Sequence, residues 1–416
     1  MVFMRAAILA VGSELLGSDR LDTDSLLLTE ALERHGVELG RKEVVGDDRA
    51  AIAETLSRLT AGHELVLVTG GLGPTTDDVT REAAAAALGR TLALDESILA
   101  EIEARFRAFG REMPAVNRRQ AMVPDGDTEV IPNALGSAPG LRLGTGSSTL
   151  FLFPGVPAEL EGMIASHIVP WLAARSGGWQ RERVTLKTAS LTESEVEERI
   201  APAYGEMGAE AISVLAGREG VLVRAYASGP EGERRRRLAE MEERLAELLG
   251  DAAYTRREDE TLEAVVGRLL AGRGETLVTA ESCTGGLVAA RLTRVAGSSA
   301  YFLGGAVTYS NALKRGLLGV PAKLLEAHGA VSEPVARAMA SGARSALGAD
   351  WAVAITGIAG PSGGTEDKPV GTVHFAWAGP DGEVDHRLRR FLGSRNRARH
   401  LAGQVALEGL RRRLLA

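Results

Sequence analysis

Short apolar runs alternate along most of the chain with longer segments whose apolar residues recur every three or four positions. The short runs predict buried strands, and the longer segments predict amphipathic helices. In the first third, the predicted strands are 5–11, 37–45, 65–69 and 149–153, and the predicted helices are 23–35, 49–60, 79–88, 96–109 and 157–164. Buried strands between helices are typical of a doubly wound, largely parallel sheet, so we expect an α/β domain.

The same alternation returns in the last third. The predicted strands are 276–279, 304–309, 351–356, 371–378 and 384–391, and the predicted helices are 261–271, 286–294, 334–347 and 395–415. Between the two regions, Gly177-Gly178 indicates a boundary, followed by a strand (183–190), a helix (192–200) with a capping box at Thr192 and Glu195, strands at 211–215 and 221–227, and a charged helix (231–249). We therefore expect two α/β domains (1–176 and 257–416) joined by a small α+β connector (177–256).

Length, composition and charge argue against a membrane-spanning, secreted, disulfide-rich or nucleic-acid-binding protein. The chain has 416 residues, enough for about two to four domains, and no apolar run approaches the roughly 20 residues of a membrane-spanning helix. The N-terminus carries one basic residue before a glycine turn, which predicts a first strand rather than a signal peptide, so we expect a cytoplasmic protein with no membrane contact. A single cysteine excludes an internal disulfide framework. A net charge of −7 argues against direct nucleic-acid binding.

Two polar clusters follow predicted strands of the first domain. One contains Gly12 and Glu14, followed by Asp22, and the other runs from Thr69 to Asp78. Backbone amides and hydroxyls suit phosphate oxygens, whereas carboxylates suit a hard cation that bridges phosphates. The candidate phosphate or nucleotide residues are Gly12, Glu14, Asp22, Gly70, Gly71, Gly73 and Thr75, and the candidate metal ligands are Asp77 and Asp78. The alternative is that the glycines form a turn and the aspartates cap a helix.

In the last domain, the apolar run 276–279 stops at Ala280-Glu-Ser-Cys-Thr-Gly-Gly286, which predicts a strand that delivers a reactive turn to a helix. Free amides and the helix dipole at such a point favour an anion, although Glu281 or Ser282 as a simple helix cap is the alternative. Ser282 as nucleophile and Lys314 as its base would suit amide hydrolysis, with backbone amides of Cys283, Gly285 or Gly286 stabilising the oxyanion.

Each of these residues also has a structural interpretation. Lys314 alone is more often a solvated surface lysine, and Tyr309 is equally compatible with a half-buried strand position. Cys283 is an alternative nucleophile, but no motif ties a histidine to it, so a small buried cysteine is the better interpretation. The run Arg234-Arg-Arg-Arg237 is surrounded by glutamates and is typical of a solvated helix face.

The first domain resembles the competence/damage-inducible protein CinA family. The resemblance rests on Gly12-Ser-Glu-Leu-Leu-Gly17, 70–78, 117–121, 133–140 and 153–160. It implies a molybdopterin-binding-like fold and hydrolysis of ADP-ribose that depends on a divalent cation such as Mg²⁺ or Co²⁺ and is stimulated by potassium. Where relatives usually have Asp-Thr-Asn, this chain has Asp22-Thr23-Asp24, and the extra carboxylate would repel a pyrophosphate unless a metal intervenes.

The resemblance extends through the rest of the chain. It makes the connector KH-like, and Gly217-Arg-Glu-Gly220 matches that module's Gly-x-x-Gly, but its place between two strands predicts a hairpin turn in a spacer or dimer element. The last third is similar to the nicotinamide-nucleotide amidohydrolase domain through 280–286, 305–311, 329–332, 354–361 and 368–373. The resemblance implies metal-free, cofactor-free conversion of nicotinamide mononucleotide to nicotinic acid mononucleotide and ammonia.

The roles implied by this resemblance are catalytic for Ser282, Lys314 and Tyr309. The implied substrate-binding residues are Thr284, Gly285, Gly286, Thr356, Gly357 and Arg395, with the neighbouring Arg397 and Arg399 as alternatives to Arg395. We therefore expect a homodimeric enzyme of pyridine-nucleotide salvage. Two alternatives remain: a competence- or damage-associated interaction protein with little catalysis, and molybdopterin handling by the first domain.

Overall fold

The computed structural model describes residues 4–18, 20–217 and 219–416, which form two compact units. The first unit contains the chain up to Glu182 together with Ala227–Arg236, and the second contains Arg183–Tyr226 and Arg237–Ala416. Both are mixed α/β structures, as the alternation of apolar patterns predicts.

A six-stranded sheet in the order β2-β1-β3-β8-β7-β6 forms the centre of the first unit. Its four parallel strands are β1 (Arg5–Val11), β2 (Glu38–Val45), β3 (Leu65–Thr69) and β8 (Thr149–Phe153). The antiparallel strands β7 (Gly140–Gly144) and β6 (Thr128–Ile131) complete the sheet beyond β8. The sequence pattern predicts the parallel strands but not this antiparallel pair, because each of the two strands is short and interrupted by polar residues.

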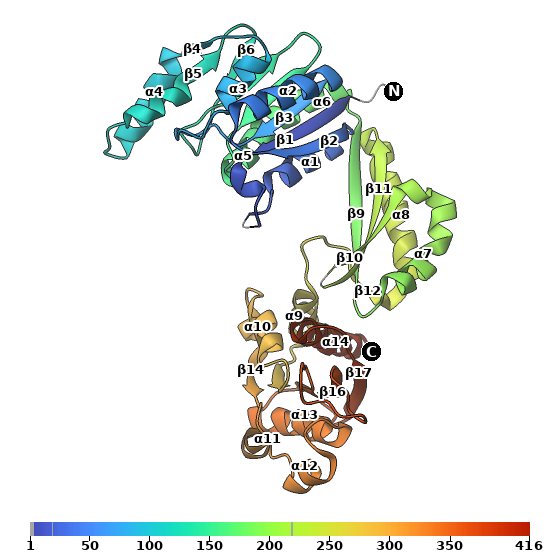
Figure 1. Cartoon of the computed structure of the whole chain (residues 1–416). Coiled ribbons are helices and arrows are strands. Elements are labelled where there is room, and N and C mark those ends of the chain that lie inside the picture. The colour runs from blue at the N-terminus through green and yellow to red at the C-terminus, as the bar shows by residue number, and fades with distance from the viewer. Residues whose placement is uncertain (1–3, 19, 218) are drawn as a thin grey trace. The chain divides into compact units, whose positions relative to one another are not determined.

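Helices cover both faces of this sheet (Figure 1). Helices α2 (Arg49–Gly62) and α3 (Thr80–Ala87) pack on Leu9, Val66 and Val68. On the opposite face, α1 (Asp24–Arg34), α5 (Pro157–Met163) and α6 (Val169–Ser176) pack on residues such as Ile8 and Leu67. Successive strand residues thus feed two cores, which is the packing of a doubly wound sheet.

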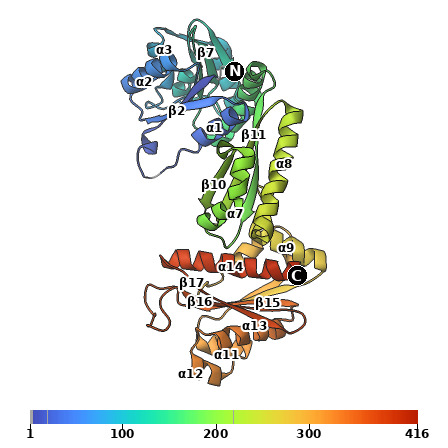
Figure 2. The same ribbon diagram turned by 90° about the vertical axis from the view of Figure 1, so that its right-hand side faces the viewer.

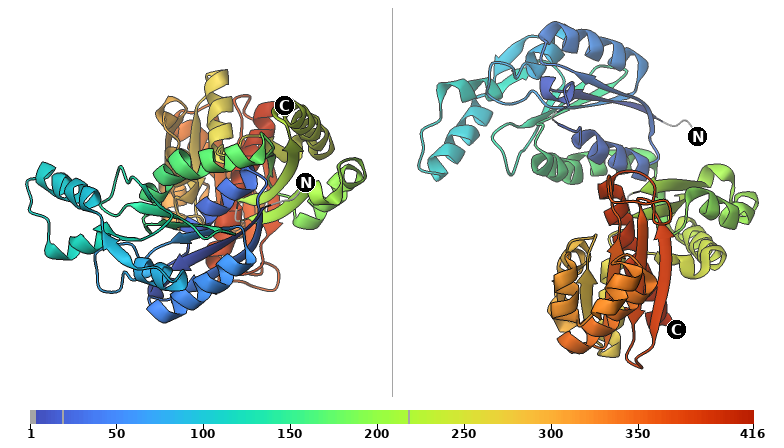
Figure 3. Two further views of the ribbon diagram at one scale, coloured as in Figure 1. Left: turned by 90° about the horizontal axis from the view of Figure 1, so that it is seen from above. Right: turned by 60° about the horizontal axis from the view of Figure 1, so that its bottom comes forward.

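One segment of the first unit lies outside the six-stranded sheet. It contains β4 (Leu92–Leu94), α4 (Glu96–Ala108) and β5 (Met122–Pro124), coloured cyan to green-blue in Figure 3. Strands β4 and β5 pair with each other, and Ile98, Leu99 and Ile102 of α4 form a small separate core with Ala121.

The connector contains a four-stranded sheet in the order β10-β11-β9-β12. Its elements are β9 (Gln180–Thr188), α7 (Glu193–Met207), β10 (Ile212–Gly217), β11 (Gly220–Gly229), α8 (Glu231–Leu249) and β12 (Ala253–Thr255). The capping box at Thr192 and Glu195 is confirmed. Strands β10 and β11 pair antiparallel up to Gly217 and Gly220, which confirms a hairpin, and Arg218 lies outside the described residues.

The last part of the second unit contains a five-stranded sheet in the order β14-β13-β15-β16-β17. Strands β13 (Leu277–Glu281), β14 (Phe302–Val307) and β15 (Trp351–Gly357) are parallel. Strands β16 (Thr372–Ala378) and β17 (Val384–Arg390) are antiparallel. The largely parallel character therefore ends at β15, and only the parallel strands share a common carboxyl edge.

Helices α14 (Arg395–Leu415) and α13 (Glu333–Leu347) lie on opposite faces of this sheet (Figure 2). Helices α9 (Leu262–Arg273) and α10 (Leu287–Thr293) share the core of α14, and α11 (Asn311–Leu318) and α12 (Ala322–His328) share that of α13. The short helices α11 and α12 are absent from the sequence prediction. This omission matters, since α11 carries Lys314.

Candidate functional site

Three loops meet at the carboxyl edge of the parallel strands in the second unit. Ser282 directly follows β13, Thr308 directly follows β14, and Thr356 lies near the end of β15. Strand β13 lies between β14 and β15, so the three loops are neighbours. Parallel sheets bind their ligands at this edge, because loops from successive strands converge there.

Ser282 and Lys314 are in direct contact. The Nζ atom of Lys314 lies 3.1 Å from the Oγ atom of Ser282, and it donates to the carbonyl oxygen of Thr308 at 2.8 Å. The amide of Ser282 donates to the carbonyl of Ile355 in the neighbouring strand, which fixes the backbone of the serine to the sheet. The serine and the lysine, 32 residues apart in sequence, therefore form a preassembled pair.

The environment of Lys314 is unusual for a lysine. Its side chain is buried, with 1% of the residue exposed, although lysine is almost never fully buried without a charged partner. Its two hydrogen-bond partners, Ser282 Oγ and Thr308 O, are both neutral. Burial lowers the pKa of the Lys314 ammonium below the ordinary lysine value. The lysine is therefore shifted toward the neutral form that a general base requires, and the solvated-surface interpretation is wrong.

Cys283 does not share this activation. It is 5% exposed, and burial raises the pKa of its thiol to about 12, so the thiolate is scarce near neutral pH. Two histidines of this domain contact each other, since His374 Nδ1 lies 2.9 Å from His386 Nε2. The structure thus supports the interpretation of Cys283 as a small buried residue.

Glu281 corrects one expectation for the turn. Its buried carboxylate accepts hydrogen bonds from the amides of Gly286, Val288 and Ala289 at 2.8 to 3.1 Å. The start of α10 is therefore capped by the chain's own anion and is not open to an external one. The amide of Gly285 is also engaged, with the carbonyl of Ser282. Of the three proposed oxyanion donors, Cys283 is the one whose amide has no such partner in the described part of the chain.

Tyr309 and Arg395 form a second pair at this edge. A guanidinium nitrogen of Arg395 donates to the Tyr309 hydroxyl at 2.9 Å, and another donates to the carbonyl of Gly360 at 2.8 Å. Tyr309 is 58% exposed, so the tyrosine is not the half-buried strand residue that we considered. One turn further along α14, Arg399 donates to the carbonyl of Thr284 at 2.8 Å. The first turns of α14 thus connect the loops around Ser282.

The remaining predicted substrate residues have structural contacts of their own. The Thr356 hydroxyl, fully buried, donates to the carbonyl of Ala330 at 2.8 Å. Gly357 packs so closely on β16 that a Cβ atom there would lie 2.7 Å from Val373. Thr284 is also fully buried, and its hydroxyl has no hydrogen-bond partner in the described residues. These contacts shape the edge of the site whatever ligand it takes.

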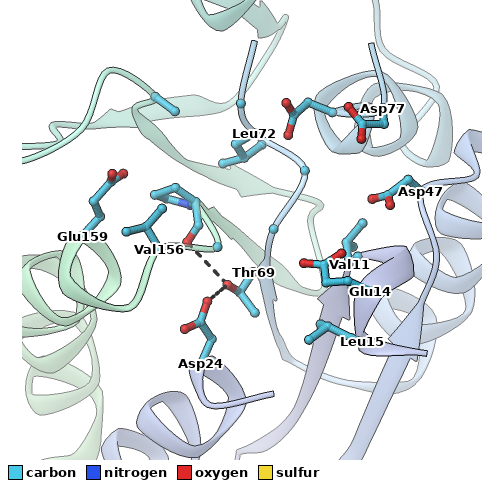
Figure 4. A pocket seen from close by; sticks show the side chains of 18 of the residues that line it. Val11, Glu14, Leu15, Asp24, Asp47, Thr69, Leu72, Asp77, Val156 and Glu159 are labelled. Carbon is cyan, nitrogen blue, oxygen red and sulfur yellow. Dashed lines mark hydrogen bonds between the residues drawn. The ribbon is translucent and has the colours of Figure 1, made fainter. Parts of the chain in front are cut away.

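The first unit contains a pocket of about 380 Å³ at the carboxyl ends of β1 and β3 (Figure 4). Seven carboxylates and one arginine are among the residues that line it: Glu14, Arg20, Asp22, Asp24, Asp47, Asp77, Asp78 and Glu159. The backbone of Gly70–Gly73 contributes another side of the pocket. The glycines are required for close packing, because a Cβ atom at Gly70 would lie 2.0 Å from the carbonyl oxygen of Val11.

The structure brings most of the predicted residues of the first domain into this pocket. Gly12, Glu14, Asp22, Gly70, Gly71 and Gly73 line it, as do Asp77 and Asp78. Thr75 is not among the lining residues; its amide and hydroxyl donate instead to Asp78.

The donor chemistry of this pocket fits a hard divalent cation. Carboxylates are its preferred protein ligands, and Asp77 with Asp78 would hold the ion. In the described ranges, however, no group of three or more His, Cys, Asp or Glu side chains is arranged to hold a metal by itself. A cation here would complete its coordination with water and phosphate oxygens, as Mg²⁺ usually does.

Comparison with known proteins covers nearly the whole chain. Residues 7–174 match the family described as probable molybdopterin binding domain, 183–255 match the damage-inducible protein CinA KH domain, and 259–414 match the CinA C-terminal domain. A competence-damage inducible protein of Symbiobacterium thermophilum is 48% identical over 90% of this chain and 89% of its own. A CinA-like protein of Solibacter usitatus is 44% identical over 99% of this chain and 98% of its own.

The chain belongs to the CinA family. A solved structure, the competence/damage inducible protein CihA of Agrobacterium tumefaciens, is 44% identical over 37% of this chain and 94% of its own, with a TM-score of 0.36. In this CinA family member, none of the helices in the described residues is long and apolar enough to cross a membrane.

Sequence reasoning about this CinA family member missed several groups at the two sites. Thr308 holds Lys314 through its backbone carbonyl, a contact that leaves no signature in side-chain chemistry. Arg399, which the sequence offered as an alternative to Arg395, holds the Ser282 turn by donating to the carbonyl of Thr284. Asp47 follows β2, Thr69 is the last residue of β3 and Glu159 lies in the first turn of α5, and all three line the acidic pocket. Asp47 was not among the predicted site residues; its place just after a strand was the available signal, since such loops gather at one edge of a parallel sheet.

Proposed function

We propose that the second unit hydrolyses the carboxamide of nicotinamide mononucleotide, giving nicotinic acid mononucleotide and ammonia through an acyl-enzyme on Ser282. The observation that carries this proposal is the contact between Ser282 Oγ and the buried Nζ of Lys314. A hydroxyl becomes a nucleophile when a base removes its proton, and a desolvated lysine is a suitable base. The family resemblance supplies the substrate.

In the first half of the reaction, neutral Lys314 accepts the proton of the Ser282 hydroxyl as Oγ attacks the carboxamide carbon. The carbonyl oxygen becomes an oxyanion, toward which the amide of Cys283 is the available donor. The carbon–nitrogen bond then breaks, and the Lys314 ammonium gives its proton to the departing nitrogen. Ammonia leaves, and the pyridine carbonyl remains bound to Ser282 as an ester.

In the second half, a water molecule attacks the ester while Lys314 accepts one of its protons. The bond between the carbonyl carbon and Oγ breaks, and Ser282 recovers its proton from Lys314. The product is a carboxylic acid on the pyridine ring. Each proton therefore passes through Lys314 Nζ, which lies within hydrogen-bond distance of Ser282 Oγ and donates to the carbonyl oxygen of Thr308.

The test is ammonia release from nicotinamide mononucleotide by purified protein with and without EDTA. Wild type is compared with Ser282→Ala, Lys314→Met and Cys283→Ala. We expect activity that resists EDTA, falls at least about 1000-fold in the first two variants and persists in the third. Retention of activity in Ser282→Ala would sink the acyl-enzyme. Absence of activity in the wild type would favour the alternative of a competence- or damage-associated interaction protein. A salt-sensitive gel shift with DNA would test that alternative.

A second activity is favoured by the acidic pocket of the first unit. We propose that this pocket hydrolyses ADP-ribose to AMP and ribose 5-phosphate with a divalent cation. The cation would neutralise phosphate charge next to the carboxylates, and this charge balance explains how a pocket with seven carboxylates could admit a pyrophosphate. The protein's own contribution is the glycine loop 70–73, which lets the ligand approach the backbone closely, and the carboxylates Asp77 and Asp78.

This second activity is measured as AMP release with Mg²⁺, Co²⁺ or no metal, each with and without potassium. We expect AMP release to require the divalent ion and to fall in Asp77→Asn and Asp78→Asn. Ser282→Ala is the matched control, because it removes the other site and should leave AMP release unchanged. Equal AMP release in EDTA would overturn the metal requirement, and copurified pterin fluorescence would favour molybdopterin handling.

A further inference from the structure

The turn that carries the candidate metal ligands of the first unit is held from outside the pocket by Arg119. One guanidinium nitrogen of Arg119 donates to the carbonyl of Thr75. The other donates to the carbonyl of Asp78 at 3.0 Å and to a carboxylate oxygen of Glu82 at 2.9 Å. Arg119 is not among the residues that line the pocket. A single side chain behind the pocket therefore bridges the two ends of the turn 75–78.

Contacts within the turn connect this bridge to the carboxylates. The amide of Asp78 donates to the carbonyl of Thr75 at 3.2 Å, and the amide and hydroxyl of Thr75 both donate to Oδ2 of Asp78. Asp77 and Asp78 line the pocket, and neither side chain is buried, so both can reach a ligand there. The backbone that Arg119 holds is thus the backbone that places these two carboxylates.

Arg119 itself stands on a fixed support. It belongs to the 3₁₀ helix η2 (Ala115–Ala121), which leads into β5 in the segment outside the six-stranded sheet. Its neighbours Asn117 and Gln120 are buried, and the side-chain amide of Asn117 donates to that of Gln120 at 2.8 Å. Ala121 is part of the small core under α4. The guanidinium therefore connects this separately packed segment to the turn of the pocket.

The charge and the hydrogen bonds of Arg119 have opposite effects on a cation in the pocket. Like charges repel, so the charge alone weakens cation binding at Asp77 and Asp78, and its removal would strengthen it. The hydrogen bonds favour binding, because carboxylates that are already held in place lose less freedom when they take up a ligand. Arginine suits this task because its planar fork presents several donors in a fixed geometry. The sign of the change on removing Arg119 therefore distinguishes the two effects.

We infer that Arg119 is a positioning residue for a divalent cation in the acidic pocket, and that it acts through the carbonyls of Thr75 and Asp78. The inference rests on the proposed function of this pocket and adds to it a residue that does not touch the cation. It also gives the segment outside the six-stranded sheet a role in the site, since that segment supplies the arginine.

The test is the binding of Mn²⁺, a paramagnetic substitute for Mg²⁺, to the full chain, followed by the electron paramagnetic resonance signal of the free ion. The double variant Asp77→Asn, Asp78→Asn identifies which bound Mn²⁺ belongs to this pocket. We expect Arg119→Ala to weaken that binding about 10- to 100-fold, the usual effect of removing a group that orients metal ligands. Arg119→Lys keeps the charge but has one donor nitrogen, so its affinity should lie between those of the wild type and Arg119→Ala.

Arg118→Ala is the matched control. Arg118 is exposed on the same 3₁₀ helix and makes no hydrogen bond to the turn in the described part of the chain, so its removal takes away the same charge without the contacts. We expect its Mn²⁺ affinity to be equal to that of the wild type or slightly higher. Circular dichroism at the binding temperature shows whether each variant is folded. If Arg119→Ala is unfolded, Arg119→Lys decides, and a wild-type affinity in that variant would overturn the inference.

An affinity in folded Arg119→Ala that equals or exceeds the wild-type value would also overturn the inference, because it would leave Arg119 with the effect of its charge alone. An equal loss in Arg118→Ala would do the same. Failure of the proposed function looks different. Wild type that binds Mn²⁺ in this pocket but releases no AMP from ADP-ribose would count against the hydrolysis alone, whereas wild type without Mn²⁺ at this site would overturn both the metal requirement and the role of Arg119.

Discussion

The guanidinium of Arg395 donates a hydrogen bond to the hydroxyl of Tyr309 at 2.9 Å, although the two residues lie 86 positions apart in the sequence. The same guanidinium holds the carbonyl of Gly360, so one side chain of α14 connects the loop after β14 with the loop after β15. Both loops border the edge where Ser282 meets Lys314. Arg395 is exposed, so its charge is available to an anionic ligand at this edge.

We predict that Arg395→Ala raises the KM for nicotinamide mononucleotide about 10- to 100-fold and changes kcat much less. The reason is that a phosphate-binding arginine contributes a charge-assisted hydrogen bond of about 1.5–3 kcal/mol that is present in both the ground state and the transition state. Steady-state kinetics of ammonia release measures the split. Arg397→Ala is the control, since Arg397 is exposed on the same turn and lies beside Gly393. If Arg397→Ala raised the KM by the same factor, the effect would come from the overall positive charge of this region and not from a specific contact of Arg395.

The pH dependence of the proposed amidase activity follows from Lys314. Burial lowers the pKa of this lysine, and the base must be neutral, so kcat/KM should rise with pH through the folded-state pKa of Lys314. The midpoint should lie below the ordinary lysine value of 10.5. A pH–rate profile of ammonia release gives this midpoint. A rate that falls as pH rises across the same range would contradict the assignment of Lys314 as base.

The lowered pKa of Lys314 also predicts that this lysine, which the proposed reaction requires, destabilises the folded chain. A lysine whose pKa is lower in the folded state binds more protons when unfolded, so the stability of the chain rises with pH between the folded and unfolded pKa values of Lys314. Below that window, the destabilisation is complete. Lys314→Met should therefore raise the midpoint of thermal unfolding at pH 6 more than at pH 10, while abolishing ammonia release. Thermal denaturation of the two proteins at the two pH values tests this sign.

The parallel strands that are buried on both faces could be predicted almost residue by residue, because such a strand is a continuous apolar run. Leu65–Thr69 and Thr149–Phe153 are examples, whereas the half-exposed β14, predicted at 304–309, lies at Phe302–Val307. The antiparallel hairpin of β6 and β7 could not be predicted in this way, since both strands are short and interrupted by polar residues. Helix α11 was missed for another reason: it follows a polar turn and contains Gly316, a residue that weakens a helical pattern.

The site was predictable in part for a different reason. Ser282 and the glycine loop at Gly70 follow strands directly, and a parallel sheet collects such residues at one edge. Glu281 shows the limit of this reasoning. A polar turn before a helix indicates an anion at the helix start, but only the structure distinguishes an external anion from the carboxylate of the preceding residue.

The capping role of Glu281 leads to a prediction of its own. Glu281→Gln replaces an acceptor-only carboxylate with an amide that has one acceptor, so at least one of the three amides at Gly286, Val288 and Ala289 loses its partner. We expect a loss of about 2 kcal/mol in the free energy of unfolding and a lower kcat, because the turn that it holds carries Ser282. Urea denaturation and ammonia release measure the two effects. Unchanged stability with reduced kcat would point to a direct role in catalysis instead.

The burial of Cys283 leads to a prediction that distinguishes Ser282 from Cys283 as the nucleophile in one experiment. Because burial raises the thiol pKa to about 12 and the side chain is 5% exposed, iodoacetamide at pH 8 should label the native protein far more slowly than the protein unfolded in guanidinium chloride. The chain has one cysteine, so mass spectrometry gives the labelled fraction without ambiguity. Native protein should keep its ammonia release throughout the treatment. Rapid native labelling with parallel loss of activity, together with an inactive Cys283→Ala, would move the acyl group from Ser282 to Cys283.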